Sequence, residues 1–412
     1  MVKNRRMLRS RRPTRTSCGH NSRMNNVQLD SFKTAHYSMT KEYFNEGVTL
    51  MGEVRIAIVG LGNCASALIQ GQYYYRNAKR DEDVPGLMHV DFGGYYPKDL
   101  KFVAAFEVNR YKIGQDIAEA MWTKPNCCIV YAPDVPKTGV KVLPGPILDG
   151  VAPHMKESFF TYDPKEIKPV DVTEELKNSQ ADMLVSYLPV GSEEASRFYA
   201  KAALDAGIGY INGMPEFIVS DPNSPLAKEF EKAGIPCAGD DVKSQLGATI
   251  LHRVLAQLYR ERGIIIENTY QLNIGGNTDF ENMQIENRLK SKRISKTMAV
   301  TSCLPYEVPT KIGPSDYVPF LGDNKVCYIT MRGRAFGDVP LDLTLKLSVQ
   351  DSPNSAGVII DVARAVKIAQ DRGVGGELSS ICSYSFKHPR YQIDDFDARK
   401  RVDEFIEGKR ER

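Results

Sequence analysis

The feature that most constrains the fold is a glycine-rich turn between a buried strand and a helix. The run Val54–Val59 is almost entirely apolar, as expected of a strand that is covered on both faces of its sheet. Gly60, Gly62 and Ala65 follow with the spacing G-x-G-x-x-A, where a helical segment begins. This spacing permits a tight turn, lets a pyrophosphate approach the backbone, and lets the helix pack closely on the strand. It predicts a dinucleotide site at the positive end of that helix.

A glutamate at the end of the next apolar run predicts which dinucleotide binds. Glu107 follows Phe102–Phe106, and its carboxylate can accept hydrogen bonds from both ribose hydroxyls. Because the same carboxylate would repel a 2′-phosphate, NAD is favoured over NADP. Tyr187 ends a further strand candidate, where side chains line the cofactor crevice, although a tyrosine that only packs there fits equally well. The predicted cofactor-binding residues in this half are Gly60, Gly62, Asn63, Cys64, Ala65, Glu107 and Tyr187.

The first part of the chain alternates between strand and helix patterns. Apolar runs at 183–188 and 208–211 enclose a helical pattern over 193–206. Parallel strands joined by helices produce this alternation, which predicts an α/β fold with a Rossmann-type doubly wound parallel sheet.

The pattern changes near residue 265. Segments 265–276 and 325–351 alternate between apolar and polar residues with a period of two, and the second contains a turn near Gly337 and Asp338. This predicts a mostly antiparallel sheet, and hence an inserted α+β domain. The helical pattern returns from Ser355.

The first fifty residues differ in composition from the rest. They have a net charge of +7, whereas the remainder has a net charge of −4. The segment fits a disordered basic tail, a transit peptide, or translation from an over-long start. Met51, directly before the first strand, favours the last interpretation. The mildly acidic remainder predicts that nucleic acid is not a partner.

The cysteine spacing and the hydropathy of the sequence predict the cellular compartment of the protein. The eight cysteines of the sequence show no C-x-x-C spacing, and no apolar run reaches the ~18 residues that a membrane helix needs. These features predict buried thiols in a reducing compartment, a cytoplasmic location, no membrane partner and no structural zinc site.

Ionisable residues cluster at the ends of predicted elements in the second half. Lys292 and Lys296 lie four residues apart, hence on one helix face, where they repel each other unless an anion such as a sugar phosphate separates them. Ser244 stands at the start of a predicted helix, where N–H groups can bind phosphate. A solvated basic face and a simple serine N-cap are the plain alternatives. Lys325 and Lys387 stand beside predicted strands or turns, and a lysine shielded from water can act as an acid or base near neutral pH.

Long stretches of the sequence identify the family that this chain resembles. Five of them are GLGNCASALIQG, GDDVKSQLGATILHRVLAQL, QLNIGGNTDFENM, SKRISKTMAVTS and SYSFKHP, and the matching stretches together span residues 54–387. They resemble the myo-inositol-1-phosphate synthase (inositol-3-phosphate synthase) family in its prokaryotic form. The family usually has aspartate where Glu107 stands, and the longer side chain alters the expected ribose geometry.

The resemblance implies a reaction and a domain plan. The reaction converts D-glucose 6-phosphate to 1D-myo-inositol 3-phosphate by oxidation at C5, enolisation, aldol ring closure and re-reduction at C5. The domain plan follows a tail at 1–50. It places the NAD-binding domain at 51–245, a catalytic and tetramerisation domain at 246–354, and a segment that completes the Rossmann domain at 355–412. The expected assembly is a homotetramer.

The resemblance also implies the site residues. Its active-site lysines and aspartates map onto Lys292, Lys296, Lys325, Lys387, Asp279, Asp323 and Asp351, with Asp241 on the cofactor side. Its phosphate-binding residues map onto Ser244, Gln245 and Lys296. Lys292 resembles the family's candidate base for the C5 hydroxyl, and Lys387 would polarise the C1 aldehyde. Prokaryotic members can use a metal, so a divalent or monovalent cation is implied, with Asp351 and Ser352 as oxygen donors.

Two other functions compete with this one. An NAD-dependent dehydrogenase of the homoserine- or semialdehyde-dehydrogenase type would also combine a Rossmann domain with an inserted antiparallel sheet, but plain hydride transfer does not need four lysines. An NAD-sensing or nucleic-acid-binding protein would use the basic tail. The acidic remainder and the absence of interleaved aromatic and basic residues disfavour it.

Overall fold

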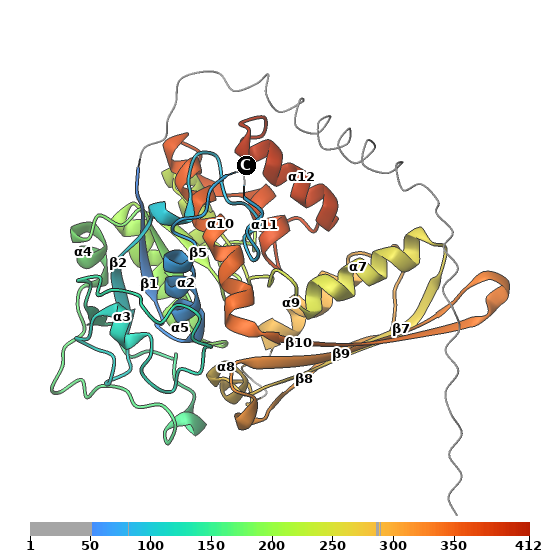
Figure 1. Ribbon diagram of the computed structural model, residues 1–412, viewed down its shortest axis with the longest axis horizontal. Coiled ribbons are helices and arrows are strands. Elements are labelled where there is room, and N and C mark those ends of the chain that lie inside the picture. The colour runs from blue at the N-terminus through green and yellow to red at the C-terminus, as the bar shows by residue number, and fades with distance from the viewer. Residues whose placement is uncertain (1–51, 81, 286–287, 289) are drawn as a thin grey trace, which may run out of the picture. The chain divides into compact units, whose positions relative to one another are not determined.

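The computed structural model describes residues 52–80, 82–285, 288 and 290–412, except for the side chains of 290–293 and 314. The predictions for the tail 1–50 therefore lie outside the described residues. The described residues belong to one compact unit that contains two sheets (Figure 1). Among them, no helix is both long enough and apolar enough to cross a bilayer.

The first sheet is parallel throughout and has the strand order β11-β6-β5-β4-β1-β2-β3. Its strands are β1 (Val54–Val59), β2 (Leu100–Glu107), β3 (Val142–Pro144), β4 (Met183–Ser186), β5 (Gly209–Asn212), β6 (Pro236–Ala238) and β11 (Gly376–Glu377). The order reverses beside β1, and in sheets of this kind ligands bind at the carboxyl ends of the strands at such a point. This confirms the predicted doubly wound sheet and places a crevice next to Gly60.

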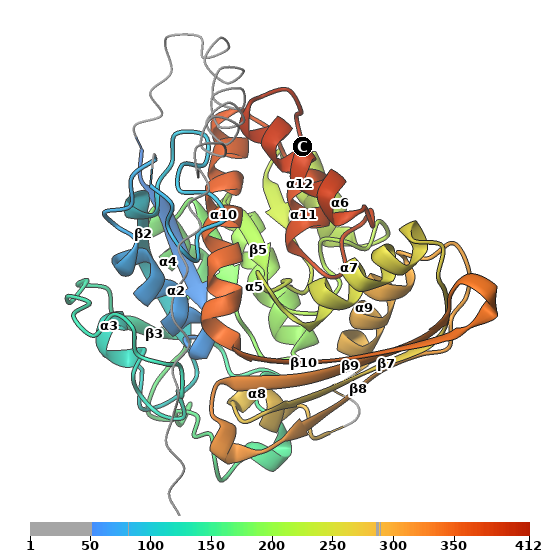
Figure 2. The ribbon, with the colours of Figure 1, turned by 45° about the vertical axis from the view of Figure 1, so that its right-hand side comes forward.

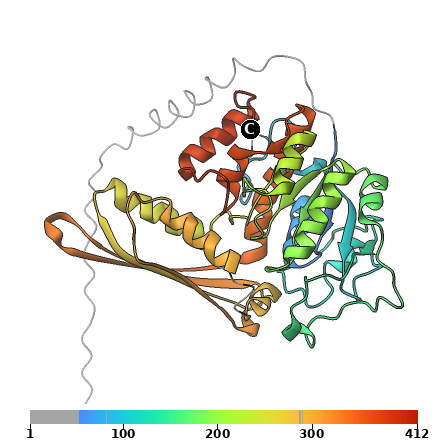
Figure 3. The same ribbon diagram turned by 180° about the vertical axis from the view of Figure 1, so that it is seen from behind.

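Helices cover both faces of this sheet because the side chains of each strand alternate. Ile56 and Ile58 of β1 point into one core with α2 (Asn63–Tyr74) and α10 (Asp351–Asp371). Ala57 and Val59 point into a second core. That core also holds residues of α4 (Val172–Asn178), α5 (Glu193–Ala206) and α6 (Pro225–Ala233), and α5 and α6 are seen from behind in Figure 3.

The second sheet has the order β10-β9-β7-β8. Its strands are β7 (Ile265–Gly275), β8 (Thr310–Tyr317), β9 (Asn324–Arg334) and β10 (Pro340–Gln350). β9 runs antiparallel to both β7 and β10, whereas β8 runs parallel to β7, so the sheet is mixed. The predicted turn is present, because Gly337 has a φ of 72° between β9 and β10. The helices α7 (Ala248–Glu261) and α9 (Lys290–Thr301) lie on one face of this sheet (Figure 2).

After β10 the chain returns to the first sheet. Helix α10 packs on α2 and on strands β1, β4, β5 and β6, and β11 then pairs with β6. The helix begins at Asp351 and not at Ser355, so the predicted boundary after residue 354 falls within its first turn. The earlier start arises because Asp323 anchors the first turn, accepting from the N–H of Ser352 at 3.1 Å. The remaining α-helices are α3 (Ile117–Ala120), α8 (Thr278–Asn282), α11 (Ser379–Ser385) and α12 (Asp395–Ile406).

Candidate active site

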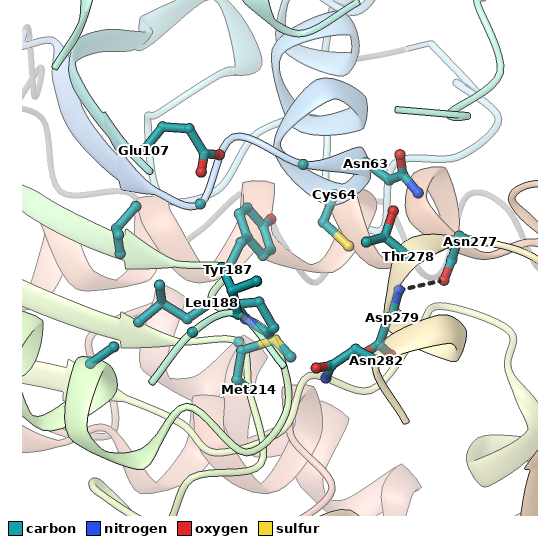
Figure 4. A pocket seen from close by; sticks show the side chains of 18 of the residues that line it. Asn63, Cys64, Glu107, Tyr187, Leu188, Met214, Asn277, Thr278, Asp279 and Asn282 are labelled. Carbon is teal, nitrogen blue, oxygen red and sulfur yellow. Dashed lines mark hydrogen bonds between the residues drawn. The ribbon is translucent and has the colours of Figure 1, made fainter. Parts of the chain in front are cut away.

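A cleft at the carboxyl ends of β1, β2 and β4 extends toward the start of the second sheet. Figure 4 shows Glu107 on one side of it, Asn277 and Asp279 on the other, and Tyr187 between them. The residues that line it come from both sheets and from α8 and α10, and they include Gly60, Gly62, Asn63, Cys64, Glu107, Tyr187, Asp241, Ser244, Asp279, Lys325, Asp351, Ser352 and Lys387. The structure thus brings together most of the predicted site residues.

The glycine turn at one end of the cleft fits a pyrophosphate. Gly60 has a φ of 83°, and a Cβ there would stand 2.6 Å from the carbonyl oxygen of Tyr187. A Cβ on Gly62 would meet no atom of the described residues within 4 Å, so this backbone faces open space. Gly62 is the N-cap of α2, and none of the side chains that the structure describes caps the helix there. The first N–H groups of α2 and the helix dipole are therefore available to an anion.

The carboxylate of Glu107 is already engaged by the backbone. One oxygen accepts from the N–H of Leu61 at 2.9 Å, and the other accepts from Val108 at 2.8 Å and Asn109 at 3.2 Å. A carboxylate has about four acceptor positions. The structure thus leaves about one for a ribose hydroxyl, where the sequence suggested two.

Lys112 is a residue of this region that the sequence motif did not reveal. Its side chain is buried, and its Nζ donates to the carbonyl of Leu61. Burial lowers the pKa of Lys112, and the neighbouring charge of Glu107 opposes that shift. Together the two side chains hold Leu61 at both its N–H and its C=O. The only signal in the sequence is the five-residue spacing from Glu107, which no motif uses.

Tyr187 presents a buried hydroxyl to the site. Burial raises its pKa well above the ordinary value, so the hydroxyl stays neutral. Among the described residues, this oxygen has no hydrogen-bond partner. A buried polar group without a partner costs about 1–3 kcal/mol, which a bound ligand could recover. This observation and the open backbone at Gly62 both fit a dinucleotide cofactor.

Two lysine–carboxylate pairs stand at the other end of the cleft. The Nζ of Lys325 lies 3.1 and 3.3 Å from the two oxygens of Asp351, and the Nζ of Lys387 lies 2.7 Å from an oxygen of Asp241. Burial lowers the pKa of Lys325, but Asp351 and then Asp279 outweigh it, and the net pKa is raised. Lys325 is therefore a charged ammonium at neutral pH.

Helix α9 reaches this end of the cleft through a serine. The Oγ of Ser295, which is fully buried, donates to the second oxygen of Asp241. Lys296 is the next residue along the helix and is buried, but it is not among the residues that line the cleft. Lys292 lies on α9, and its side chain is outside those described.

Asp323 lies behind the cleft and connects two of the segments that form its wall. It is buried and accepts from the side-chain amide of Asn277 at 3.1 Å and from the Oγ of Ser352 at 2.8 Å. Burial, and then the charge of Asp351, raise its pKa to about 6. Asp323 does not line the cleft, and it joins the turn after β7 to the first turn of α10.

The structure corrects the predicted surroundings of Ser244. Helix α7 begins at Ala248 with the extended Gly247 as its N-cap, so Ser244 is neither a helix N-cap nor at a helix N-terminus. The chain is held short of the helix because Asn354 accepts from the N–H of Gln245 at 2.9 Å. Ser244 still lines the cleft, whereas the side chain of Gln245 is bound to the carbonyl of Gly86.

The oxygen donors predicted for a cation are occupied by other contacts. Lys325 covers both oxygens of Asp351, and the hydroxyl of Ser352 donates to Asp323. The described part of the chain contains no group of three or more His, Cys, Asp or Glu residues that could hold a metal ion. The arrangement therefore does not fit a cation unless Lys325 moves away.

Comparison with known proteins decides the family. A family model described as myo-inositol-1-phosphate synthase matches residues 247–352. The inositol-3-phosphate synthase of Mycolicibacterium smegmatis is 53% identical over 364 residues, which cover 87% of this chain and 99% of that protein. This chain belongs to the inositol-3-phosphate synthase family. The synthase of Corynebacterium glutamicum is 54% identical and covers 86% of this chain and 98% of its own length.

Solved structures agree with this assignment. Ari2 shares 35% identity with a TM-score of 0.68, covering 86% of this chain and 99% of that chain. A myo-inositol-1-phosphate synthase-related protein from Thermotoga maritima has a TM-score of 0.73 at 23% identity, covers 86% of this chain and 98% of its own, and supports the fold alone. The predicted family, fold class and enzyme type are thereby confirmed. The dehydrogenase alternative has no comparable support among these relatives.

Proposed function

We propose that the cleft binds NAD together with D-glucose 6-phosphate and closes the sugar into 1D-myo-inositol 3-phosphate. The observation that carries this proposal is the pair of ammonium groups, Lys325 and Lys387, in the same cleft as the glycine turn. A plain dehydrogenase needs fewer cations, because the alkoxide of the hydride-transfer step is the one oxyanion that it has to stabilise. Enolisation and aldol closure each generate an oxyanion.

The cofactor is held by the chain's own backbone in this proposal. The N-terminus of α2 binds the pyrophosphate, and Gly62 lets it approach. Glu107 accepts from one ribose hydroxyl and disfavours a 2′-phosphate, while Lys112 keeps the turn in place. Bound NAD would accept the hydride from C5 and later return it.

The lysines have separate proposed roles in proton removal, charge stabilisation and phosphate binding. Lys325 carries its charge at neutral pH, so it suits stabilisation of the enolate and not proton removal. Lys387 polarises the C1 aldehyde, with Asp241 fixing its ammonium. Lys292 is the proposed base for the C5 hydroxyl. Lys296, Ser244 and Gln245 are the proposed phosphate residues, and the last two require the 244–247 turn to face the substrate.

Carboxylates orient these groups. Asp351 and Asp279 surround the ammonium of Lys325, and Asp323 holds the first turn of α10 that carries Asp351. The homotetramer and the cytoplasmic location remain proposals from the family resemblance and the cysteine pattern.

The test is incubation with glucose 6-phosphate and NAD, with the product identified by mass and NMR spectroscopy. We expect inositol 3-phosphate, many turnovers per NAD and no accumulation of NADH absorbance. Substrate deuterated at C5 should keep its label, since the hydride leaves and returns on one bound cofactor. Stoichiometric NADH release would overturn the proposal in favour of a dehydrogenase.

A further inference from the structure

A buried group of charges lies behind the active site and does not line the cleft. It consists of Arg253 on α7, Asp395 at the start of α12, and Lys243 between two cleft residues, and we call it the ionic hub. Each side chain is at most 9% exposed. The Nε of Arg253 lies 2.6 Å from one oxygen of Asp395, and the Nζ of Lys243 lies 3.0 Å from the other.

The hub connects helices that are distant in the sequence. The guanidinium of Arg253 also donates to the carbonyl of Ala299 on α9 and to that of Ile393 before α12. The Nζ of Lys243 donates to the carbonyl of Ser383 on α11 at 2.8 Å. Arginine suits this role because its planar group offers five donors in a fixed arrangement. Helices α7, α9, α11 and α12 are seen in Figure 2.

Backbone hydrogen bonds connect the hub to the segments that carry the proposed catalytic groups. Lys243 follows Asp241 by two residues, and its own N–H donates to the carbonyl of Ser385 at 2.8 Å. The N–H of Lys387 in turn donates to the carbonyl of Asp241 at 2.7 Å. On the other side, α9 carries Ser295, which donates to Asp241. Both segments that converge on Asp241 are thus fastened to the same three charges.

We propose that Asp395, Arg253 and Lys243 are positioning residues that fix Lys387 and the lysines of α9 in the geometry for ring closure. The proposal rests on the proposed function, because it assumes that those lysines act on the substrate. The hub residues do not line the cleft, so in this proposal they act on the substrate only through other residues. Their effect is transmitted by backbone contacts to α9 and to the 385–387 segment. A displacement of about 1 Å in a catalytic group can cost about 100-fold in rate.

The chain offers a matched control in a second buried ionic cluster. Asp361 on α10 pairs with Arg364, which is fully buried, and with His89, and this cluster holds residues 89–95 to α10. Loss of either central aspartate leaves a buried arginine without its counter-charge. Only Asp395 is connected to α9 and to the segment of Lys387.

The test compares Asp395→Asn and Lys243→Met with Asp361→Asn. Rates are expressed per folded enzyme, and thermal unfolding is measured for each variant. We expect both hub variants to lose at least tenfold in kcat with KM for NAD changed less than threefold, and Lys243→Arg to recover part of the loss. Asp361→Asn should lose stability to a similar extent as Asp395→Asn but keep kcat within threefold.

The outcomes are separable. If Asp395→Asn does not fold, Lys243→Met decides, because it leaves the Arg253–Asp395 pair intact. A kcat loss in Asp361→Asn as large as in the hub variants, or no loss in Lys243→Met, would overturn the proposal and leave the hub as a purely structural feature. Failure of the proposed function would show in the unmodified enzyme as NADH release, whereas failure of the hub proposal shows only in the variants.

Discussion

The two ends of the cleft are built in different ways. The cofactor end is centred on backbone groups of one short segment, the turn from Gly60 to Ala65, with side chains such as Glu107 beside it. The catalytic end uses charged side chains that the fold collects from distant segments. Lys325 and Asp351 are 26 residues apart, and Lys387 and Asp241 are 146 apart. The first end should therefore fail when its backbone is altered, and the second when single side chains are removed.

The largest expected effect breaks the catalytic end alone. Lys292→Ala should abolish inositol phosphate formation while NAD binding and the fold persist, because the cofactor end lies on other segments. General acid–base help is worth about 10²–10⁴ in rate. Product formation and NAD binding by calorimetry are the measurements. Lys201→Ala is the control, because that side chain is exposed on α5 and pairs with Asp205 only four residues away. Near-normal turnover in Lys292→Ala would contradict the mechanism.

The next effect breaks the cofactor end. Gly60→Ala should raise KM for NAD at least tenfold, since the new Cβ would collide with a backbone carbonyl at a φ of 83°. Its matched control is Gly207→Ala at the end of α5, where φ is 77° but no atom in the described part of the chain lies within 4 Å of a Cβ. The control should lose a little stability and keep its KM. Equal KM values in the two variants would show that the collision at Gly60 is unimportant.

A smaller effect sharpens the role of charge at the cofactor end. Glu107→Gln should reduce the preference for NAD over NADP by about tenfold, the equivalent of about 1.4 kcal/mol, because it removes the charge that repels a 2′-phosphate. Competitive binding of the two cofactors to wild type and variant is the measurement. Comparable affinity of the wild-type enzyme for both cofactors would refute the assignment of Glu107.

The smallest expected effect concerns His89, which lies outside both ends of the cleft, and the pH dependence of stability. Burial lowers the pKa of His89, but hydrogen bonds and charge from Asp361 and then Asp403 outweigh it, and the net pKa is raised above 6.5. A raised pKa means that the folded state holds the proton more tightly. The contribution of His89 to stability is thus complete below about pH 6.5 and is lost as pH rises through the folded-state pKa.

The measurement is the free energy of unfolding of wild type and His89→Gln between pH 5.5 and about pH 9. We expect the difference between the two proteins to shrink with rising pH, by about 1.4 kcal/mol for each unit by which the pKa is raised. The rate constant kcat of the folded enzyme should not change. A difference that grows with pH would contradict the sign of the shift.

The cofactor end and the catalytic end also differ in how much of each could be predicted from the sequence. Strand β1 and the turn after it were predictable because all the information lies in consecutive residues: apolar pattern, glycine spacing and helix start. The start of α7 was predicted wrongly, because a hydrogen bond to Asn354, over a hundred residues away, holds the chain short of the helix. Local propensity does not contain such a contact.

At the catalytic end, the contacts between residues could not be predicted from the sequence. The family resemblance supplied the identities of Lys325, Asp351 and Lys387, but not their pairing. The first pair arises only when β9 meets α10, and the second only when the 385–387 segment meets Asp241. The buried contacts behind them were beyond reach for the same reason. Arg253 and Asp395 are 142 residues apart, and nothing near either one distinguishes it from a surface charge.

Helix α10 has a mechanical consequence. Strand β10 ends at Gln350 and the helix begins at Asp351, so no flexible linker separates the second sheet from a rod about 30 Å long that packs into the first. The same rod carries Asp351 and Ser352 at its tip, in the wall of the cleft. A hinge at this junction would have to unwind a helix whose first turn is clamped by Asp323. We therefore expect substrate to enter and product to leave through local movement of the cleft's loops. The two sheets should keep the same relative orientation throughout the catalytic cycle.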